Sequence, residues 1–331
     1  MTDTPRFLVA PDSFKGTFSA PEVAEAIAAG LREAGAAADL CPVADGGEGT
    51  AQALRAALGG ETRQAPAHDP LGRSLEAEYV LLADGETAVV DTAAASGLPL
   101  LTAAERDAEA ASSRGTGELI AAAIEAGAGR VILAAGGSAT TDGGRGAVEA
   151  LRERGGSGDA TLEILCDVTT PFEDAARVFA PQKGADEATV ARLGRRLDAY
   201  ARDLPRDPRG VPMSGAAGGL SGGLWAAFDA HLRPGAQFVL DLLDFERRLG
   251  AADAAIAGEG RIDSQSLEGK IVGQIAAICA RAKRDLHVLV GLDELDPAAL
   301  DGLPVRSIRE AGTLEALRAA GAGLAAAAQR G

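Results

Sequence analysis

Five glycine-rich loops constrain the fold of this 331-residue chain more than any other feature. Each follows an apolar run and combines glycines with acids, hydroxyls or a lysine. The loops are APDSFKGT (10–17), PVADGGEGT (42–50), AAGGSATTDGG (134–144), SGAAGGLSGGL (214–224) and AGEGRIDSQSLEGK (257–270). Loops that run from a strand to the following helix lie at the carboxyl edge of a parallel sheet, where α/β proteins bind ligands. One such loop is more simply a tight turn, but five together indicate backbone N–H groups that approach an anion.

The pattern of elements between these loops predicts an α/β protein. FLVA (7–10) reads as a buried strand, and Ser19 with Glu22 predicts a capping box at the start of a helix. Apolar residues on both sides of Asp84-Gly85 predict a β-hairpin, which is not a crossover connection. From about residue 236 the strand–helix rhythm returns with QFVLDLL.

We therefore expect two α/β domains. Strand–helix alternation at both ends of the chain predicts a discontinuous Rossmann-like domain with a parallel sheet, made of residues 1–65 plus 236–331. Residues 66–235 would form an inserted mixed-sheet α/β domain.

Charge and composition exclude some classes of binding partner. A net charge of −16 and an aromatic content of 3% argue against nucleic acid and against an anionic membrane. We see no signal peptide and no apolar window long enough to span a bilayer. Three scattered cysteines give no disulfide framework, so we expect a cytoplasmic protein. The expected partner is a small-molecule substrate. A homo-oligomer is compatible with this sequence.

Lysine usage points to anion binding. The chain has four lysines against 28 arginines and no asparagine. Three of the lysines stand directly beside a glycine: Lys15, Lys183 and Lys270. Because arginine would serve equally well on a surface, we interpret at least two of these as phosphate-binding ammonium groups.

The known phosphate and hydrolase motifs are absent from the sequence. There is no G-x-x-x-x-G-K-[ST], no G-x-G-x-x-G after the first strand, no protein-kinase signature and no G-x-S-x-G. What remains is acids, lysines and glycine loops, a combination that suits phosphoryl transfer. Five aspartates follow strand-like runs: Asp12, Asp45, Asp142, Asp167 and Asp263. About half of them would serve only as helix caps or turn formers.

Taken together, the motifs resemble the type I glycerate kinase family. The matching stretches are APDSFKGTFSA, PVADGGEGT, DTAAASGLPLL, GTGELI, GGSATTDGG, CDVTTP, FAPQKGA, GAAGGLSGGL and GEGRIDSQSLEGK. The resemblance implies an ATP-dependent, Mg²⁺-requiring kinase that converts D-glycerate to 2-phosphoglycerate, or alternatively to 3-phosphoglycerate. It also implies two α/β domains with the active site in the cleft between them.

Two departures from the family pattern bear on the substrate. Thr141 and Thr170 stand where the family usually has asparagine, so an amide donor is lost and a hydroxyl is kept. The region from 151 to 180 is shorter than is usual in the family.

We assign roles to the candidate residues on this basis. Lys15 and Lys183 would bind carboxylate or phosphate charge, and either Asp45 or Asp142 would be the acid near the substrate hydroxyl. The expected substrate-binding residues are Asp12, Ser13, Ser138 and Arg261. The expected nucleotide- and phosphate-binding residues are Gly136, Gly137, Gly143, Gly144, Gly215, Gly218 and Gly219. Asp167 and Asp263 are the candidate ligands for Mg²⁺ or ribose.

Two other functions remain open at this point. One is a kinase of a different small hydroxy acid in the same fold. The other is a non-catalytic protein of this fold that binds phosphate or an organic acid.

Overall fold

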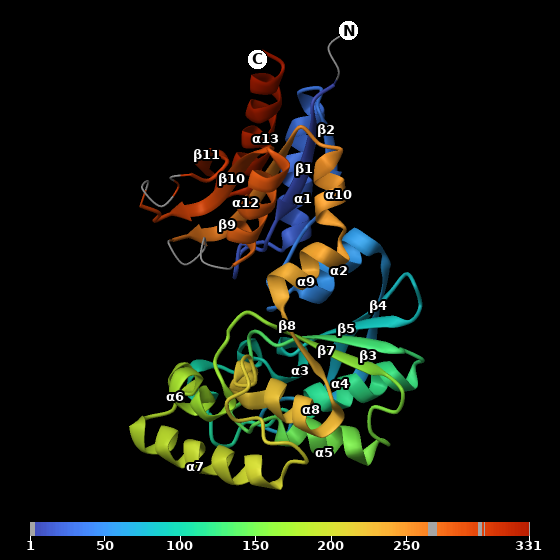
Figure 1. The fold of residues 1–331 in the computed structure, drawn as a ribbon, viewed down its shortest axis with the longest axis vertical. Coiled ribbons are helices and arrows are strands. Elements are labelled where there is room, and N and C mark those ends of the chain that lie inside the picture. The colour runs from blue at the N-terminus through green and yellow to red at the C-terminus, as the bar shows by residue number, and fades with distance from the viewer. Residues whose placement is uncertain (1–3, 264–269, 297–299, 301, 331) are drawn as a thin grey trace. The chain divides into compact units, whose positions relative to one another are not determined.

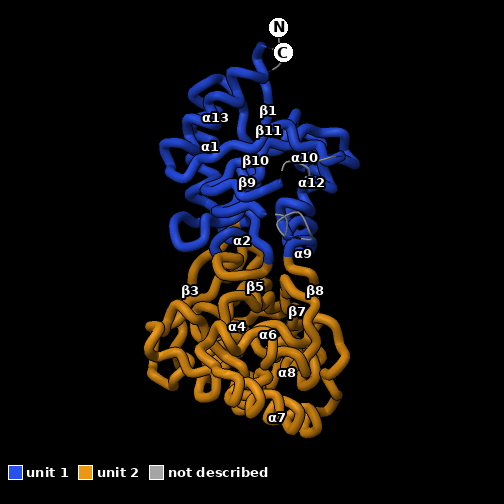
Figure 2. Tube along the Cα trace, turned by 90° about the vertical axis from the view of Figure 1, so that its left-hand side faces the viewer, with its two compact units in different colours: residues 1–45, 52–58, 236–331 blue, residues 46–51, 59–235 orange. Residues whose placement is uncertain are grey.

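The chain forms two compact units in the computed structural model, which describes residues 4–263, 270–296, 300 and 302–330. Unit 1 comprises residues 1–45, 52–58 and 236–331, and unit 2 comprises residues 46–51 and 59–235. Figure 2 colours the two units separately. Residues 60–65, placed in the first domain by the sequence pattern, begin strand β3 and pair with β4 inside unit 2.

Unit 1 is built on a five-stranded sheet in the order β11-β10-β9-β1-β2. All four neighbouring pairs are parallel. The strands are β1 (Arg6–Pro11), β2 (Ala37–Leu40), β9 (Ala254–Ile262), β10 (Asp285–Asp293) and β11 (Val305–Glu310). The expected discontinuous parallel sheet is therefore confirmed, and β1 lies between β2 from the N-terminal part of the chain and β9 from the C-terminal part.

Helices cover both faces of this sheet (Figure 1). On one face, α1 (Ala20–Glu33) packs against α13 (Leu314–Ala328), and Val23, Ile27 and Leu31 form the buried stripe of α1. The expected capping box of Ser19 and Glu22 starts α1. On the other face, α12 (Ile271–Ala282) lies on β9 and β10 and contacts α10 (Phe245–Gly250). Crossovers that run in opposite directions from the sheet centre place helices on opposite faces in this way.

Unit 2 contains a six-stranded mixed sheet in the order β3-β4-β5-β6-β7-β8. Its strands are β3 (Gly60–His68), β4 (Ser74–Leu82), β5 (Thr87–Asp91), β6 (Arg130–Ala134), β7 (Thr161–Cys166) and β8 (His231–Pro234). The β3–β4 and β4–β5 pairs are antiparallel and the other three are parallel. The hairpin expected at Asp84-Gly85 is the β4–β5 connection, in which Val80 pairs with Val89.

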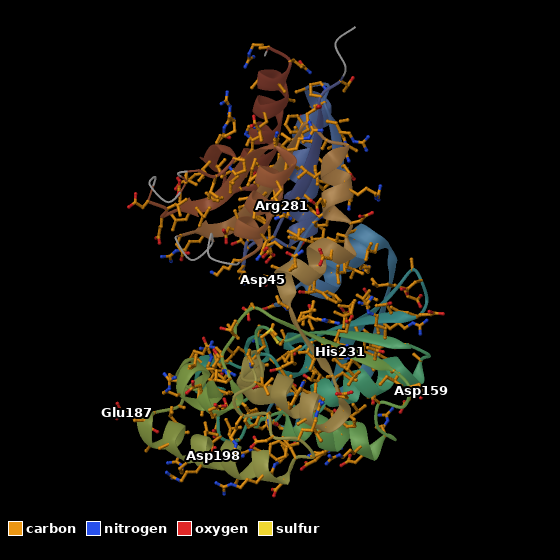
Figure 3. All side chains as sticks on the ribbon, in the orientation of Figure 1. Asp45, Asp159, Glu187, Asp198, His231 and Arg281 are labelled. Atoms are coloured by element: carbon orange, nitrogen blue, oxygen red, sulfur yellow. The ribbon has the colours of Figure 1, made fainter. Side chains whose placement is uncertain are left out.

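Three helices bury the apolar face of this mixed sheet. They are α4 (Arg114–Glu125), α5 (Arg145–Glu153) and α8 (Leu220–Phe228), which share one core with the strands. A second core joins α6 (Ala175–Phe179) to α7 (Glu187–Asp203) through Phe172, Leu193 and Leu197. Glu187 and Asp198, labelled in Figure 3, lie on α7.

The short elements of unit 2 are mostly single turns. They are α3 (Ala93–Ser96), η1 (Leu98–Leu100), η2 (Ala103–Glu105), η3 (Phe172–Asp174), η4 (Pro181–Lys183) and η5 (Ala216–Gly219).

The QFVLDLL run does not form a strand. Residues of this run belong to helix α9 (Gly235–Leu242), because Val239, Leu240 and Leu243 are buried at helical spacing. Helix α2 (Thr50–Leu58) follows the second glycine loop. Among the described residues, no helix combines the length and the apolar character that crossing a membrane requires.

Candidate active site

Unit 1 contains a cavity at the carboxyl ends of its parallel strands. The cavity has a volume of about 500 Å³ and is lined by residues that follow β1, β2, β9 and β11, by the C-terminal parts of β9 and β10, and by the start of α12. The chain runs from β1 to β2 in one direction and from β9 to β11 in the other, so the sheet reverses its winding between β1 and β9. In open α/β sheets this switch point is where ligands bind.

Two carboxylates and a lysine lie together in this cavity. The Asp45 carboxylate lies 3.5 Å from Lys15 Nζ, and Asp12 Oδ1 accepts a hydrogen bond from the Ser13 N–H at 2.6 Å. Burial, together with the charge of Asp45, raises the pKa of Asp12 to about 7. Asp45, labelled in Figure 3, is 12% exposed in its side chain, whereas Lys15 is 71% exposed. A buried carboxyl beside an exposed ammonium is an arrangement that can move a proton and hold an anion at the same place.

The remaining charged side chains of the cavity come from β9 and the start of α12. Glu259, Arg261, Asp263 and Lys270 all line it. Arg261 forms an ion pair with Glu294. The structure therefore brings together six of the residues predicted from the sequence. These are Asp12, Ser13, Lys15, Asp45, Arg261 and Asp263. Residues 264–269 of the fifth loop lie outside the described residues.

The other predicted residues lie in unit 2. Among them, the carboxylate of Asp142 forms hydrogen bonds that hold the local fold. Asp142 Oδ2 accepts hydrogen bonds from the Ser113 N–H at 2.9 Å, the Ser113 hydroxyl at 2.8 Å and the Gly146 N–H at 3.1 Å. Its Oδ1 accepts from the Gly144 N–H at 3.0 Å. The carboxylate thus ties together the N-terminal turns of α4 and α5, where a negative charge is stabilised by both helix dipoles.

Close packing explains why positions 143 and 218 of unit 2 are glycines. A Cβ at Gly218 would lie 2.0 Å from the Thr140 carbonyl oxygen, and a Cβ at Gly143 would lie 2.9 Å from the side chains of Phe172 and Leu197. Several of the predicted phosphate-binding N–H groups already donate inside the protein. They are those of Gly136, Gly143, Gly144, Gly215 and Gly219. Direct phosphate contact by these N–H groups therefore has no support in their geometry, and the roles of Gly137 and Gly218 stay predictions.

Lys183 is buried against the third glycine loop. Its Nζ donates to the Ser138 hydroxyl at 3.0 Å and to the Thr140 carbonyl at 2.5 Å. Burial lowers the pKa of Lys183 to about 7, and the charge of Asp142 opposes this shift. With 2% of its surface exposed, Lys183 holds the loop in place from inside.

This burial predicts a pH-dependent contribution to stability. Between pH 7 and pH 10.5 the unfolded chain keeps a proton on Lys183 that the folded chain releases, so the folded state gains stability as pH rises. We expect the free energy of unfolding of the native protein to rise relative to Lys183→Met across this window, on the order of 1 kcal/mol per pH unit.

Urea denaturation of both proteins at several pH values from 7 to 9.5 measures this difference. Lys283→Met, at an exposed lysine, is the control for the loss of a lysine from the surface. Parallel stability curves for the native protein and Lys183→Met would contradict the predicted shift.

Asp167, Thr141 and Thr170 are the remaining residues singled out from the sequence. Asp167 follows β7 in unit 2, so it belongs to a different unit from Asp263. Thr141 is buried, and its hydroxyl has no hydrogen-bond partner among the described residues. The Thr170 carbonyl accepts from the Gly215 N–H at 2.9 Å.

Sequence reasoning missed several residues at these sites. Glu259, Gly291 and Gly312 line the cavity, and only Glu259 lies within a motif that was singled out. Asp91, which ends β5, accepts from the N–H groups of Gly49 and Ala51 at 2.9 and 3.1 Å and thereby holds the start of α2. Burial raises the pKa of Asp91 to about 6. Its position at the end of an apolar strand, as the first residue of the motif DTAAASGLPLL, was the available signal.

Comparison with known proteins agrees with this arrangement. The profile of the glycerate kinase family matches residues 7–156 and 154–329. A glycerate 2-kinase from Escherichia coli K12 is 39% identical over 323 residues, which cover 86% of this chain and 85% of the relative. A glycerate kinase from Bacillus subtilis 168 is 40% identical over 302 residues, with 80% of this chain and 79% of the relative covered.

A solved structure extends the similarity to three dimensions. A crystal structure from Salmonella typhimurium LT2, provisionally named glycerate kinase 2, superposes with a TM-score of 0.87 at 34% identity. The match covers 99% of both chains. The profile, the relatives and the shared fold together show that this chain is an enzyme, a kinase that belongs to the glycerate kinase family.

Proposed function

We propose that the enzyme transfers the terminal phosphoryl group of ATP to the 2-hydroxyl of D-glycerate, giving 2-phosphoglycerate. The observation that carries this proposal is the group of Asp12, Asp45 and Lys15 in a cavity at the switch point of the unit 1 sheet. Family membership and the names of the relatives, glycerate kinase and glycerate 2-kinase, support the substrate.

Asp12 is the proton acceptor in this proposal. A carboxyl whose pKa is about 7 is half ionised near neutral pH, where a general base is most effective. The glycerate hydroxyl oxygen forms a bond to the terminal phosphorus, the bond from that phosphorus to the bridging oxygen of ADP breaks, and Asp12 takes the hydroxyl proton. Lys15 lies beside Asp45 with most of its side chain exposed, so its ammonium can bind the phosphate charge that moves.

The donor set of the cavity fits Mg²⁺. Mg²⁺ is usually held by one or two carboxylates together with water and substrate phosphates. The cavity offers carboxylate oxygens from Glu259 and Asp263, while the described residues contain no group of three acids, histidines or cysteines spaced to hold a metal. Asp263 would hold the ion, which when bound neutralises phosphate charge.

A coupled assay of ADP release tests the proposal. D-Glycerate should support turnover with ATP and Mg²⁺, whereas lactate, hydroxypyruvate and tartronate should be poorer substrates. ³¹P NMR of the product separates 2-phosphoglycerate from 3-phosphoglycerate. Preferred turnover of another hydroxy acid would replace glycerate as the substrate, and binding without ADP release would overturn the assignment of a kinase reaction.

A further inference from the structure

A tight turn carries Lys15 into the lining of the unit 1 cavity. Phe14 and Phe18 form an antiparallel bridge, in which the Phe14 N–H donates to the Phe18 carbonyl at 2.8 Å and the Phe18 N–H donates to the Phe14 carbonyl at 3.0 Å. The Thr17 N–H donates to the same Phe14 carbonyl at 2.8 Å. Gly16 has a φ of +79°, in the left-handed region that glycine adopts without strain. We call residues 14–18 the Lys15 turn, and these contacts fix its backbone.

The side chain of Phe14 anchors this turn to the parallel sheet. Phe14 is 3% exposed and belongs to the core of unit 1. Its ring packs against two glycines, Gly258 of β9 and Gly291 of β10, since a Cβ at either position would lie 3.6 Å from a ring carbon of Phe14. The buried ring therefore holds the turn against both strands.

Gly260 of β9 lies against the backbone of the Lys15 turn. A Cβ at Gly260 would lie 3.2 Å from Phe14 Cα, 3.4 Å from the Phe14 carbonyl carbon and 3.3 Å from the Lys15 backbone nitrogen. These distances are shorter than a Cβ normally keeps, and all three atoms belong to the backbone, so a methyl group at position 260 must displace the turn by a few tenths of an ångström. The φ of Gly260 lies outside the left-handed region, so close approach is what requires glycine at this position.

The position of the Lys15 ammonium depends on this backbone. Lys15 Nζ lies 3.5 Å from the Asp45 carboxylate, and 71% of the Lys15 side chain is exposed, so solvent surrounds most of its flexible four-carbon stem. Displacing a group that acts in a reaction by about 1 Å can cost about 10²-fold in rate. The point at which Lys15 leaves the backbone therefore decides how well its ammonium reaches the transferring phosphate.

We propose that Gly260 and Phe14 are positioning residues that place Lys15 for phosphoryl transfer. Phe14 anchors the Lys15 turn to the sheet, and Gly260 lets the turn approach β9 closely enough for the ammonium to reach the phosphate. The inference rests on the proposed function, in which Lys15 binds the phosphate charge that moves. It gives Gly260, in the stretch GEGRID, a role other than donating an N–H group to phosphate.

Gly260→Ala tests this placement with a single methyl group. We expect kcat to fall on the order of tenfold, because the displaced turn weakens the contact between Lys15 and the transferring phosphate. The KM for D-glycerate should stay within about twofold of native, because this contact is made in the transition state. Gly250→Ala is the matched control in unit 1 and should leave both constants unchanged, since among the described residues its Cβ would meet no atom outside the adjoining backbone within 4 Å.

A double-mutant cycle with Lys15→Met separates placement from a general effect on the fold. Lys15→Met alone should lower kcat at least as much as Gly260→Ala. Adding Gly260→Ala to Lys15→Met should change kcat by less than about twofold, because the group that Gly260 places is already gone. Phe14→Leu, which keeps an apolar side chain but loses the ring, should lower kcat several-fold in the native background and not in Lys15→Met. Urea denaturation shows whether each variant is folded under the assay conditions.

A spectroscopic readout follows Lys15 without turnover. The chain has four lysines, so reductive methylation with ¹³C-formaldehyde gives at most four lysine signals in an NMR spectrum, besides that of the N-terminus. Lys15→Met identifies the Lys15 signal by its loss. We expect this signal to shift in Gly260→Ala and in Phe14→Leu and to stay in place in Gly250→Ala.

The outcomes separate this inference from the proposed function. If the native protein does not turn over D-glycerate, or if Lys15→Met keeps the native kcat, the proposed function or its assignment of Lys15 fails, and the Lys15 signal decides whether Gly260 and Phe14 place this side chain. If Lys15→Met loses kcat but Gly260→Ala and Phe14→Leu keep it, with the Lys15 signal unmoved, only this inference fails. A tenfold loss on adding Gly260→Ala to Lys15→Met would show that Gly260 acts on another group and would overturn the inference as well.

Discussion

The Asp12→Asn variant is expected to turn over glycerate at least about 100-fold more slowly than the native enzyme, with ADP affinity nearly unchanged. The amide cannot accept the hydroxyl proton, and general-base catalysis contributes about 10²- to 10⁴-fold. Steady-state kinetics give kcat, and calorimetry with ADP gives the affinity. Near-normal kcat would show that Asp12 is not the base.

The Asp45→Asn variant is the companion to this experiment. The negative charge of Asp45 helps to raise the pKa of Asp12, so its removal should lower that pKa. Because Asp12 must be ionised to act as a base, kcat/KM of the native enzyme should rise with pH through about 7, and this limb should move to lower pH in the variant. A limb that stays in place would assign the titration to another group.

The Asp142→Asn variant is expected to lose stability, by about 3 kcal/mol in the free energy of unfolding. Asp142 Oδ2 accepts from two N–H groups and a hydroxyl, so an amide NH₂ in its place would set donor against donor at the N-termini of α4 and α5. Urea denaturation measures the loss. At low temperature, where the variant is folded, kcat should remain within about tenfold of native because no proton transfer is assigned to Asp142.

The control for this variant is Asp159→Asn, at an exposed aspartate of unit 2 (Figure 3). We expect its stability to change by less than about 0.5 kcal/mol. A native-like stability for Asp142→Asn, with a large loss of kcat, would restore Asp142 as the acid near the substrate.

The fold was predictable because its signals are local. The buried strand at 7–10, the capping box at Ser19 and the hairpin at Asp84-Gly85 each depend on a few neighbouring residues, and each is present. The prediction for QFVLDLL was wrong because a short apolar run is compatible with a strand and with a buried helix. Only the burial pattern in the structure distinguishes the two. Strand β3 was missed because its polar residues, from Gly60 to Gln64, hide the alternation.

The site was predictable only in part. Order along a parallel sheet places Asp12, Asp45 and Asp263 at one edge, and that placement follows from the sequence. The sequence does not show whether a carboxylate or an N–H group is already hydrogen-bonded within the protein, because the partners are distant in sequence. Asp142 meets Ser113, and Lys183 meets Ser138, across 29 and 45 residues. A glycine that accommodates a neighbouring chain therefore looks the same, in sequence, as a glycine that binds phosphate.

The position of β1 between β2 and β9 has a consequence for synthesis on the ribosome. β1 pairs with β2 nearby, but its other neighbour, β9, begins at Ala254. The middle of the unit 1 sheet therefore cannot form until the last quarter of the chain is synthesised. Every strand of unit 2 has already been made by Pro234. Until β9 is made, the edge of β1 that later pairs with it has no partner strand, and the apolar side chains of Phe7 and Val9 lack part of their core, so the nascent enzyme is open to misassembly over this interval.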